Sequence, residues 1–281
     1  KLLSAPIETN SLIDATGDAK IFQKLNCEFL NNSENIFQPS SLRFIMSGIN
    51  TEEFSRWLLD YDTNRDVTTS CNVGGYTYLS TAYTWEGVKW ALKPIFEKAI
   101  ANNELSIEDC NYFQIFSVAG TPDSIAFNAP RLINLNNKNP YIAGRKAIYK
   151  LSQFCIKHLP GFEKAYISSI ANSLGIRASR QIKGEYLYTY NDLISGKRFN
   201  KPVLISNYPV DIHSEKKGAS TLKKVEIEYQ LPIESLISCN YKNLYAIGRC
   251  ISADYKAQGA LRIIPSCFSM GEGLAKFLAT N

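Results

Sequence analysis

The chain has 281 residues and a formal net charge of +5, because 31 lysines and arginines face 26 aspartates and glutamates. Hydrophobic residues make up 45% and charged residues 20%, which is typical of a globular protein of one or two domains and excludes a disordered or low-complexity chain. The basic residues cluster only in short pairs, so we expect no nucleic-acid partner.

The first predicted elements are a strand, a tight turn and the start of a helix. Residues 11–13 form a short β-favouring run, which stops at the turn-forming cluster 14–18. Residues 19–25 then have a helical pattern. The polar, asparagine-rich stretch 26–41 is interpreted as a connection that leaves this first unit.

Three amphipathic helices are predicted after this connection. One starts near Thr51, a candidate N-cap, and a second has apolar residues at helical spacing over 85–99. The third and longest covers 140–159 and is ended by Pro160 and a glycine. Each should bury one apolar stripe against the rest of the protein.

The periodicity then changes from helical spacing to alternation. After a short predicted helix over 163–174, residues 182–190 and 225–229 alternate apolar and polar side chains, which is typical of half-buried antiparallel strands. An apolar strand over 243–247 and a terminal helix over 264–280 follow. The middle of the chain is therefore predicted as mixed helix and antiparallel strand.

Cysteine spacing and hydropathy indicate the cellular setting. The seven cysteines form no C-x-x-C pair and the chain has only two histidines, so we expect reduced thiols and no metal site. No apolar run is long enough to cross a bilayer, and the first ten residues lack the apolar stretch of a secretion signal. We therefore expect a soluble, cytoplasmic protein with no membrane partner.

The segment 243–267 is the most informative part of the sequence. A strand ends at Gly248, a loop rich in small residues follows, and Pro265 stands near the start of a helix that is rich in serine and glycine. Small residues let a backbone approach a flat or phosphorylated ligand, and the first turn of a helix offers free N–H groups and a positive dipole. The same small face could instead pack against a sheet, and the spacing leaves both interpretations open.

A second motif, I-D-A-T-G-D, ends the first predicted strand. Gly17 permits the turn, and Thr16 and Asp18 place polar groups where ligands gather in open α/β sheets. The pattern D-x-T-G also occurs in ordinary turns and in aspartic proteases. A protease of that type would need a second copy and an all-β chain, and the sequence has neither.

Together these two motifs resemble the FAD-dependent oxidoreductases of the glutathione-reductase-like two-domain flavoprotein group, distant relatives of the fumarate reductase flavoprotein. In that family an I-D-A-T-G-D turn closes the first part of the FAD domain, and N-L-x-x-x-G-R-C-I-S leads back into it. The similarity continues through residues 159–163, 175–185 and 208–213 and so spans nearly the whole chain.

The resemblance implies a fold between α/β and α+β, in which a partial, Rossmann-like FAD domain is interrupted by a substrate domain. The FAD domain would comprise residues 1–30 and 236–281. The mixed helix and antiparallel-sheet substrate domain would comprise residues 31–235. The implied reaction is hydride transfer between a small-molecule organic substrate and flavin N5, with an electron acceptor that the sequence does not identify.

The resemblance also implies which residues meet the cofactor FAD. The first motif would line the adenosine or pyrophosphate side, the glycine and arginine after the last strand would approach the ribityl or pyrophosphate, and residues 259–262 would lie near the isoalloxazine. The residues so implied are Ala15, Thr16, Gly17, Gly248, Arg249, Gly259, Ala260, Leu261 and Arg262.

One family feature is missing from the sequence. Family members begin with a strand and a G-x-G-x-x-G turn that carries the pyrophosphate, but here Gly271 and Gly273 are followed by Lys276 where the third glycine belongs. We interpret the sequence as the C-terminal portion of a longer protein, inactive by itself. The alternative is a non-catalytic binding or structural module that kept the fold and lost the cofactor.

Four further side chains are candidates for chemistry. His213 is the candidate general acid or base because the unperturbed pKa of histidine lies near neutrality, and Asp211 would share its strand face. Arg262 is the second candidate catalytic residue, as a positive charge near the flavin. Arg177 and Arg180 are candidates for binding an anionic group. A structural histidine and surface salt bridges are the alternatives.

Overall fold

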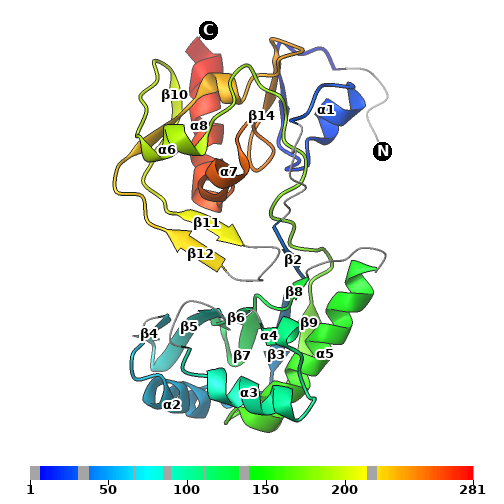
Figure 1. Ribbon diagram of the computed structural model, residues 1–281, viewed down its shortest axis with the longest axis vertical. Coiled ribbons are helices and arrows are strands. Elements are labelled where there is room, and N and C mark those ends of the chain that lie inside the picture. The colour runs from blue at the N-terminus through cyan, green and yellow to red at the C-terminus, as the bar shows by residue number, and fades with distance from the viewer. Residues whose placement is uncertain are drawn as a thin grey trace. The chain divides into compact units, whose positions relative to one another are not determined.

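The computed structural model shows a mixed α/β protein whose sheets are mostly antiparallel (Figure 1). It describes residues 7–30, 38–65, 67–84, 90–110, 112–132, 139–213 and 220–280. The chain divides into two compact units. Unit 1 comprises residues 1–37, 177–212 and 221–281, and unit 2 comprises residues 38–176 and 213–220.

Unit 2 is built on a six-stranded antiparallel sheet, in the order β4-β5-β6-β7-β3-β9. Its strands are β3 (Phe44–Ser47), β4 (Thr68–Val73), β5 (Tyr76–Thr84), β6 (Tyr112–Val118), β7 (Thr121–Phe127) and β9 (Tyr166–Ile170). Gly74 and Gly75 have φ values of 60° and 84°, which suits the two-residue turn between β4 and β5. The short strands β2 (Ser40–Ser41) and β8 (Arg131–Leu132) form a separate pair.

The described residues of unit 2 include four helices, and the core of the unit is strongly aromatic. The helices are α2 (Thr51–Tyr61), α3 (Lys93–Ala101), α4 (Ile107–Cys110) and α5 (Pro140–His158). The rings of Phe44 and Phe127 stack with centroids 4.3 Å apart, and those of Phe96 and Phe154 lie equally close. One continuous cluster of buried apolar side chains joins the sheet to these helices.

The predicted helices of unit 2 are confirmed in part. The helix over 140–158 forms as expected, and α2 begins at Thr51, but its N-cap is Asn50, whose side chain accepts a hydrogen bond from the backbone of Glu53. The hydroxyl of Thr51 donates to the carbonyl of Pro122 instead. The helix predicted over 85–99 is α3, which starts at Lys93 and has a proline in its first turn. Residues 85–89 of the predicted stripe lie outside the described residues.

Three other expectations about elements are wrong. In the segment 225–229, which is predicted to be a strand, only Tyr229 lies in one. The segment predicted as a helix over 163–174 contains strand β9, because its backbone pairs with β3. Residues 182–190 do not form a continuous strand, since their backbone hydrogen bonds go to several different segments. For example, Ile182 N donates to Cys250 O (2.8 Å) and Tyr186 N to Glu234 O (3.1 Å).

Unit 1 combines short strands with helices, and the last of these helices, α7 and α8, lie near the end of the chain. Its first and last strands, β1 (Leu12–Asp14) and β14 (Leu244–Ala246), pair in parallel. Strands β10 (Pro202–Ser206) and β13 (Tyr229–Pro232) are antiparallel, and β11 (Val210–His213) pairs with β12 (Ser220–Lys223). The helices are α1 (Lys20–Lys24), α6 (Tyr190–Ile194), the 3₁₀ turn η1 (Ile233–Ser235), α7 (Tyr255–Leu261) and α8 (Ile264–Thr280).

The boundaries of the compact units differ from the predicted domain boundaries. The prediction places residues 31–235 in one inserted domain, whereas residues 177–212 and 221–235 cluster with the chain ends. The reason is their backbone bonding: Tyr188 N donates to Ser252 O (3.1 Å), and Leu30 N donates to Gln181 O (3.0 Å). Which unit meets the cofactor and which the substrate stays a prediction.

None of the helices in the described part of the chain combines the length and apolar composition that a bilayer crossing requires. The most apolar long helix, α8, instead packs against β10. A Cβ atom on Gly273 would lie 2.1 Å from the carbonyl oxygen of Val203, so only glycine permits this approach. At this position the small helix face packs against a strand, the second of the two interpretations left open by the sequence.

Candidate functional site

The two motifs from opposite ends of the chain meet in unit 1. Leu12 pairs with Leu244 and Asp14 with Ala246, and Ile247 N donates to Asp14 O over 3.1 Å. Because β1 and β14 are parallel, the loops that follow them leave the same edge of the sheet. The prediction that these two distant stretches lie side by side is confirmed.

The buried carboxylate of Asp14 organises the loop between β1 and α1. Its Oδ1 accepts from the backbone N–H (2.9 Å) and hydroxyl (2.7 Å) of Thr16, and its Oδ2 accepts from Ile21 N (2.8 Å). Thr16 Oγ1 in turn accepts from Lys20 N (3.0 Å). These contacts satisfy free N–H groups at the start of α1, so the hydroxyl of Thr16 has a structural role in this loop.

Arg249 covers the turn at Gly17. Gly17 has a φ of 72°, and a Cβ atom there would lie 2.8 Å from Arg249 Nη1, so the guanidinium occupies the space that a side chain would fill. Arg249 Nη2 donates to Asp18 Oδ1 over 2.7 Å. Burial raises the pKa of Asp18, but hydrogen bonds from Arg249 and Ser179 outweigh it and hold the pKa below its ordinary value.

A third segment, which begins at residue 177, joins the same loop. Ser179 Oγ donates to Gly17 O (3.2 Å), and the exposed side chain of Arg180 reaches Asp18 O at 3.5 Å. Two guanidinium groups, those of Arg180 and Arg249, therefore converge on the turn between β1 and α1. The predicted anion-binding residue Arg180 lies beside the predicted cofactor-binding turn, which the sequence alone does not indicate.

Gln258 on α7 connects this third segment to the loop after β14. Its buried Nε2 atom donates to the carbonyls of Arg177 (3.3 Å) and Arg249 (3.1 Å). Asp254 caps α7 by accepting from Ala257 N (2.8 Å), which fixes the start of the helix that carries the glutamine. Sequence reasoning missed Gln258, because nothing in a single glutamine between small residues signals a buried bridge.

Arg262, the predicted charge near the flavin, forms a partly buried ion pair. Its Nη2 donates to the carbonyl oxygen (3.0 Å) and to Oδ2 (3.2 Å) of Asp211. Burial lowers the pKa of Arg262 below its ordinary value, and the attraction of Asp211 offsets only part of this. Asp211, predicted to orient His213, therefore has its carboxylate paired with an arginine.

The other predicted cofactor-binding residues lie in α7 or in the loops after β1 and β14. Gly259, Ala260 and Leu261 are buried in α7, where Gly259 lets the helix approach Asp211 O, so the structure gives them a packing role. Gly248 has a φ of 88°, and a Cβ atom there would meet nothing nearer than Cys267 Sγ at 4.0 Å. Ala15 is exposed in the loop after β1. Cofactor contact stays a prediction for all of these residues.

His213 ends strand β11, but its side chain lies outside the described residues. Its proposed acid or base role therefore stays a prediction. In the described part of the chain, no group of three or more histidine, cysteine, aspartate or glutamate side chains is placed to hold a metal ion. The candidate site is thus defined by the loops after β1 and β14 and by residues 177–180.

The donors of this site fit an anionic ligand. Guanidinium groups bind phosphate and carboxylate oxygens, and those of Arg180 and Arg249 lie at one turn. Arg249 also has a buried Nε without a hydrogen-bond partner in the described structure, while the backbone at Gly248 stays open to close approach. These residues fit the pyrophosphate of a dinucleotide.

Comparison with known proteins gives one match. A family model described as FAD dependent oxidoreductase matches residues 4–280. This range contains both end motifs and the segment around residue 177. No curated protein and no solved structure matches the chain.

Proposed function

The chain belongs to the FAD dependent oxidoreductase family, whose cofactor is FAD. From this premise we propose that it catalyses hydride transfer between a small organic substrate and the flavin. The bound cofactor would supply a two-electron acceptor or donor at flavin N5. The observation that carries the proposal is the parallel pairing of β1 with β14, which joins the two motifs that resemble this family.

The residues of the paired loops would hold the nucleotide part of FAD. Arg249 and Arg180 would supply positive charge to the pyrophosphate, and Gly248 and Gly17 would let the backbone come close to it. To do so, Arg249 would exchange part of its contact with Asp18 for the ligand. The strand pair β1–β14 would be the described part of a Rossmann-like sheet.

Arg262 and His213 are proposed to act at the reacting end of the site. The Arg262 guanidinium is held by Asp211 and partly buried, so it would present a fixed positive charge to a developing negative one. His213 would hold or accept a proton. Arg177, whose main-chain carbonyl is fixed by Gln258, is proposed to position an anionic substrate group.

A phosphate-binding turn would have to come from outside the printed sequence. The G-x-G-x-x-G pattern is absent from these 281 residues. We propose that the chain is the C-terminal portion of a longer flavoenzyme and has no activity alone. The support for this is the missing turn together with a paired loop that retains the family's motif.

A non-catalytic module is the second candidate, and one observation favours it. In this structure the guanidinium of Arg249 fills the space over Gly17, and the hydroxyl of Thr16 is engaged by Asp14. A protein that had lost its cofactor would retain such contacts, because they hold the fold together. Under this alternative the protein would bind a partner without redox chemistry.

The visible absorption spectrum of the protein purified from its intact gene separates the two candidates. A flavoenzyme is expected to show flavin bands that bleach when substrate or a chemical reductant is added. A colourless protein that stays free of flavin after incubation with FAD would support the module instead. In the flavin-bound enzyme, His213→Ala is expected to change the pH dependence of flavin reduction, and an unchanged profile would remove His213 from the proposal.

A further inference from the structure

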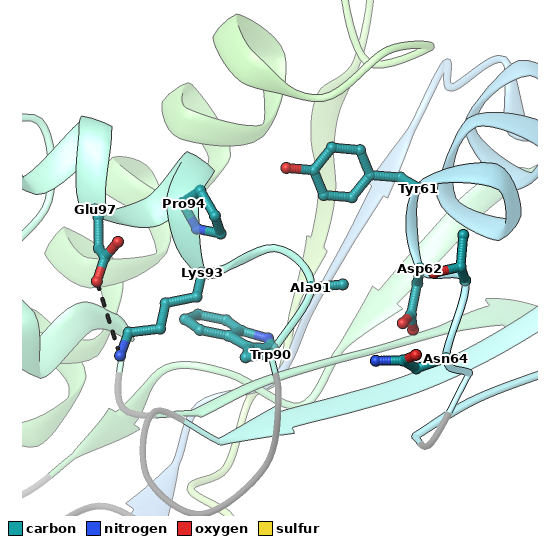
Figure 2. A pocket seen from close by; sticks show the side chains of 9 residues that line it. Tyr61, Asp62, Asn64, Trp90, Ala91, Lys93, Pro94 and Glu97 are labelled. Atoms are coloured by element: carbon teal, nitrogen blue, oxygen red, sulfur yellow. Dashed lines mark ion pairs between the residues drawn. The ribbon is translucent and has the colours of Figure 1, made fainter.

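A pocket of about 730 Å³ opens in unit 2, where α2 ends and α3 begins (Figure 2). This volume lies within the range of small-molecule sites in proteins. All the residues that line it belong to the same compact unit. They are Tyr61, Asp62, Thr63, Asn64, Trp90, Ala91, Lys93, Pro94 and Glu97.

Asp62 is the lining residue whose side chain indicates a ligand in this pocket. The residue is only 2% exposed, yet it lines the pocket. Its Oδ2 accepts from the hydroxyls of Thr68 (2.6 Å) and Tyr83 (2.5 Å). Its Oδ1 has no hydrogen-bond partner among the residues that the structure describes. One oxygen of a buried carboxylate is therefore left to the pocket.

No cation of the described chain pairs with Asp62. The other charged residues of the lining, Lys93 and Glu97, form an ion pair with each other over 3.8 Å, drawn in Figure 2 on the side away from Asp62. Two carboxylates and one ammonium leave the lining with a net charge of −1. Burying a charge without an opposite partner is costly, so a cationic ligand would be stabilised here.

The hydroxyl partners of Asp62 cannot replace such a cation. Burial, and then the hydrogen bond to Asp62, raises the pKa of Tyr83 to about 12, so its phenol stays neutral. The hydroxyl of Thr68 is shared with Thr81 at 2.9 Å. These groups orient the carboxylate and satisfy Oδ2 but bring no positive charge.

Two aromatic rings on the pocket wall are held in place by their neighbours. Tyr61, 41% exposed, stacks on Trp57 with ring centroids 5.2 Å apart. Trp90 packs against Phe96 at 4.6 Å and Tyr83 at 5.6 Å. In Figure 2 Tyr61 and Trp90 lie on opposite sides of Ala91. Tyrosine and tryptophan rings attract organic cations, so the wall adds to the attraction of the carboxylate.

We propose that this pocket binds a small organic ammonium ion, whose charged group pairs with Asp62 Oδ1 and whose carbon atoms contact Tyr61 and Trp90. The exposed amide of Asn64, at the same end as Asp62 in Figure 2, would accept a further N–H from the ligand. The proposal does not depend on FAD. It therefore stands or falls separately from the proposed oxidoreductase function.

The test is titration of the protein with n-butylammonium and tetramethylammonium chloride, followed by NMR through the indole N–H of Trp90. The neutral isostere n-butanol is the matched ligand. We expect saturable binding of at least one ammonium ion and at least about tenfold weaker binding of the alcohol. Absence of saturation by both ammonium ions, or equal binding of butanol, would overturn the proposal.

Three variants make the assignment specific. Asp62→Asn keeps an oxygen acceptor and is expected to abolish the preference for ammonium over butanol, while Tyr61→Leu should weaken ammonium binding. Glu52→Gln removes an exposed carboxylate of α2 that lies outside the lining and pairs with Arg56, so it should leave the preference in place. If Asp62→Asn does not fold, the exposed Tyr61 and Glu52 variants still decide, because a loss at Glu52 with none at Tyr61 would contradict the assigned geometry.

Discussion

Unit 2 and unit 1 are held together by different means. In unit 2 one apolar cluster with stacked aromatic rings joins a six-stranded antiparallel sheet to its helices. In unit 1 the buried apolar residues form two clusters, and polar contacts such as Arg249 to Asp18 join segments 231 residues apart. Unit 2 should therefore be most sensitive to lost core volume, and unit 1 to lost polar contacts between distant segments.

The largest expected effect is Phe127→Ala in unit 2. Phe127 is fully buried and its ring contacts those of Phe44, Phe113 and Phe162. Removing such a side chain should lower the free energy of unfolding by about 4 kcal/mol. Chemical denaturation measures this change in the free energy of unfolding. Phe268→Ala is the control, because Phe268 is 77% exposed and its removal should leave the stability unchanged. Similar losses in both variants would contradict the comparison.

Asp14→Ala tests the polar assembly of unit 1. The substitution leaves the N–H groups of Thr16 and Ile21 without their buried acceptor, so unfolding of unit 1 should become easier by about 3 kcal/mol. Asp14→Asn keeps one oxygen acceptor and should cost less. Thermal denaturation that ranks the alanine variant no worse than the asparagine variant would show that these hydrogen bonds do not hold the loop.

Gly17→Ala and Gly120→Ala compare a crowded turn of unit 1 with an open turn of unit 2. Both glycines have positive φ values, 72° and 79°, so both variants should lose about 1 kcal/mol from backbone strain. Only at Gly17 would the new methyl group displace the guanidinium of Arg249.

The pKa of Asp18, measured by NMR titration, distinguishes these two effects. Its folded value is lowered, with hydrogen bonds from Arg249 and Ser179 outweighing burial. Displacement of Arg249 in Gly17→Ala should therefore move the pKa upward. Gly120→Ala should leave it unchanged. An unchanged pKa in both variants would mean that Arg249 does not depend on the space over Gly17.

The smallest expected effect is a pH dependence in unit 2. Hydrogen bonds from Lys157 and His158 lower the pKa of Glu104 from 4.5 to about 2. The folded pKa lies below the unfolded one, so this stabilisation is present above pH 4.5 and is lost as the pH falls towards 2. Glu104→Gln should flatten the stability profile in that window, measured by denaturation at several pH values. A profile identical to the parent protein would exclude the pair.

Periodic patterns predicted the helices better than the strands. The apolar spacing and flanking prolines of α5 mark its range well, and α8 follows its predicted limits. The segment 163–174 is predicted to be helical, but pairing with β3 makes part of it strand β9. Its central residues, Ser168 and Ser169, show no apolar alternation that would indicate a strand. The pairing of β5 with β6, whose sequences are separated by α3 and α4, also depends on such long-range contacts.

The candidate site was predictable in its parts and not in its contacts. The two motifs at the chain ends could be recognised, and their meeting through β1 and β14 is confirmed. The position of Arg249 over Gly17, the bridge made by Gln258 and the unpaired oxygen of Asp62 each require side chains that are distant in sequence to be placed together. No local pattern in a single sequence contains that information.

The most direct measurement of the central claim is FAD binding by the protein from its intact gene, compared with its Arg249→Gln and Arg56→Gln variants. Both variants remove one positive charge, but Arg56 is an exposed residue of α2. We predict that the parent protein and Arg56→Gln bind FAD equally, and that Arg249→Gln binds it at least about tenfold more weakly. Equal affinity of all three proteins, or no binding by the parent, would contradict a nucleotide site built from the two ends of this chain.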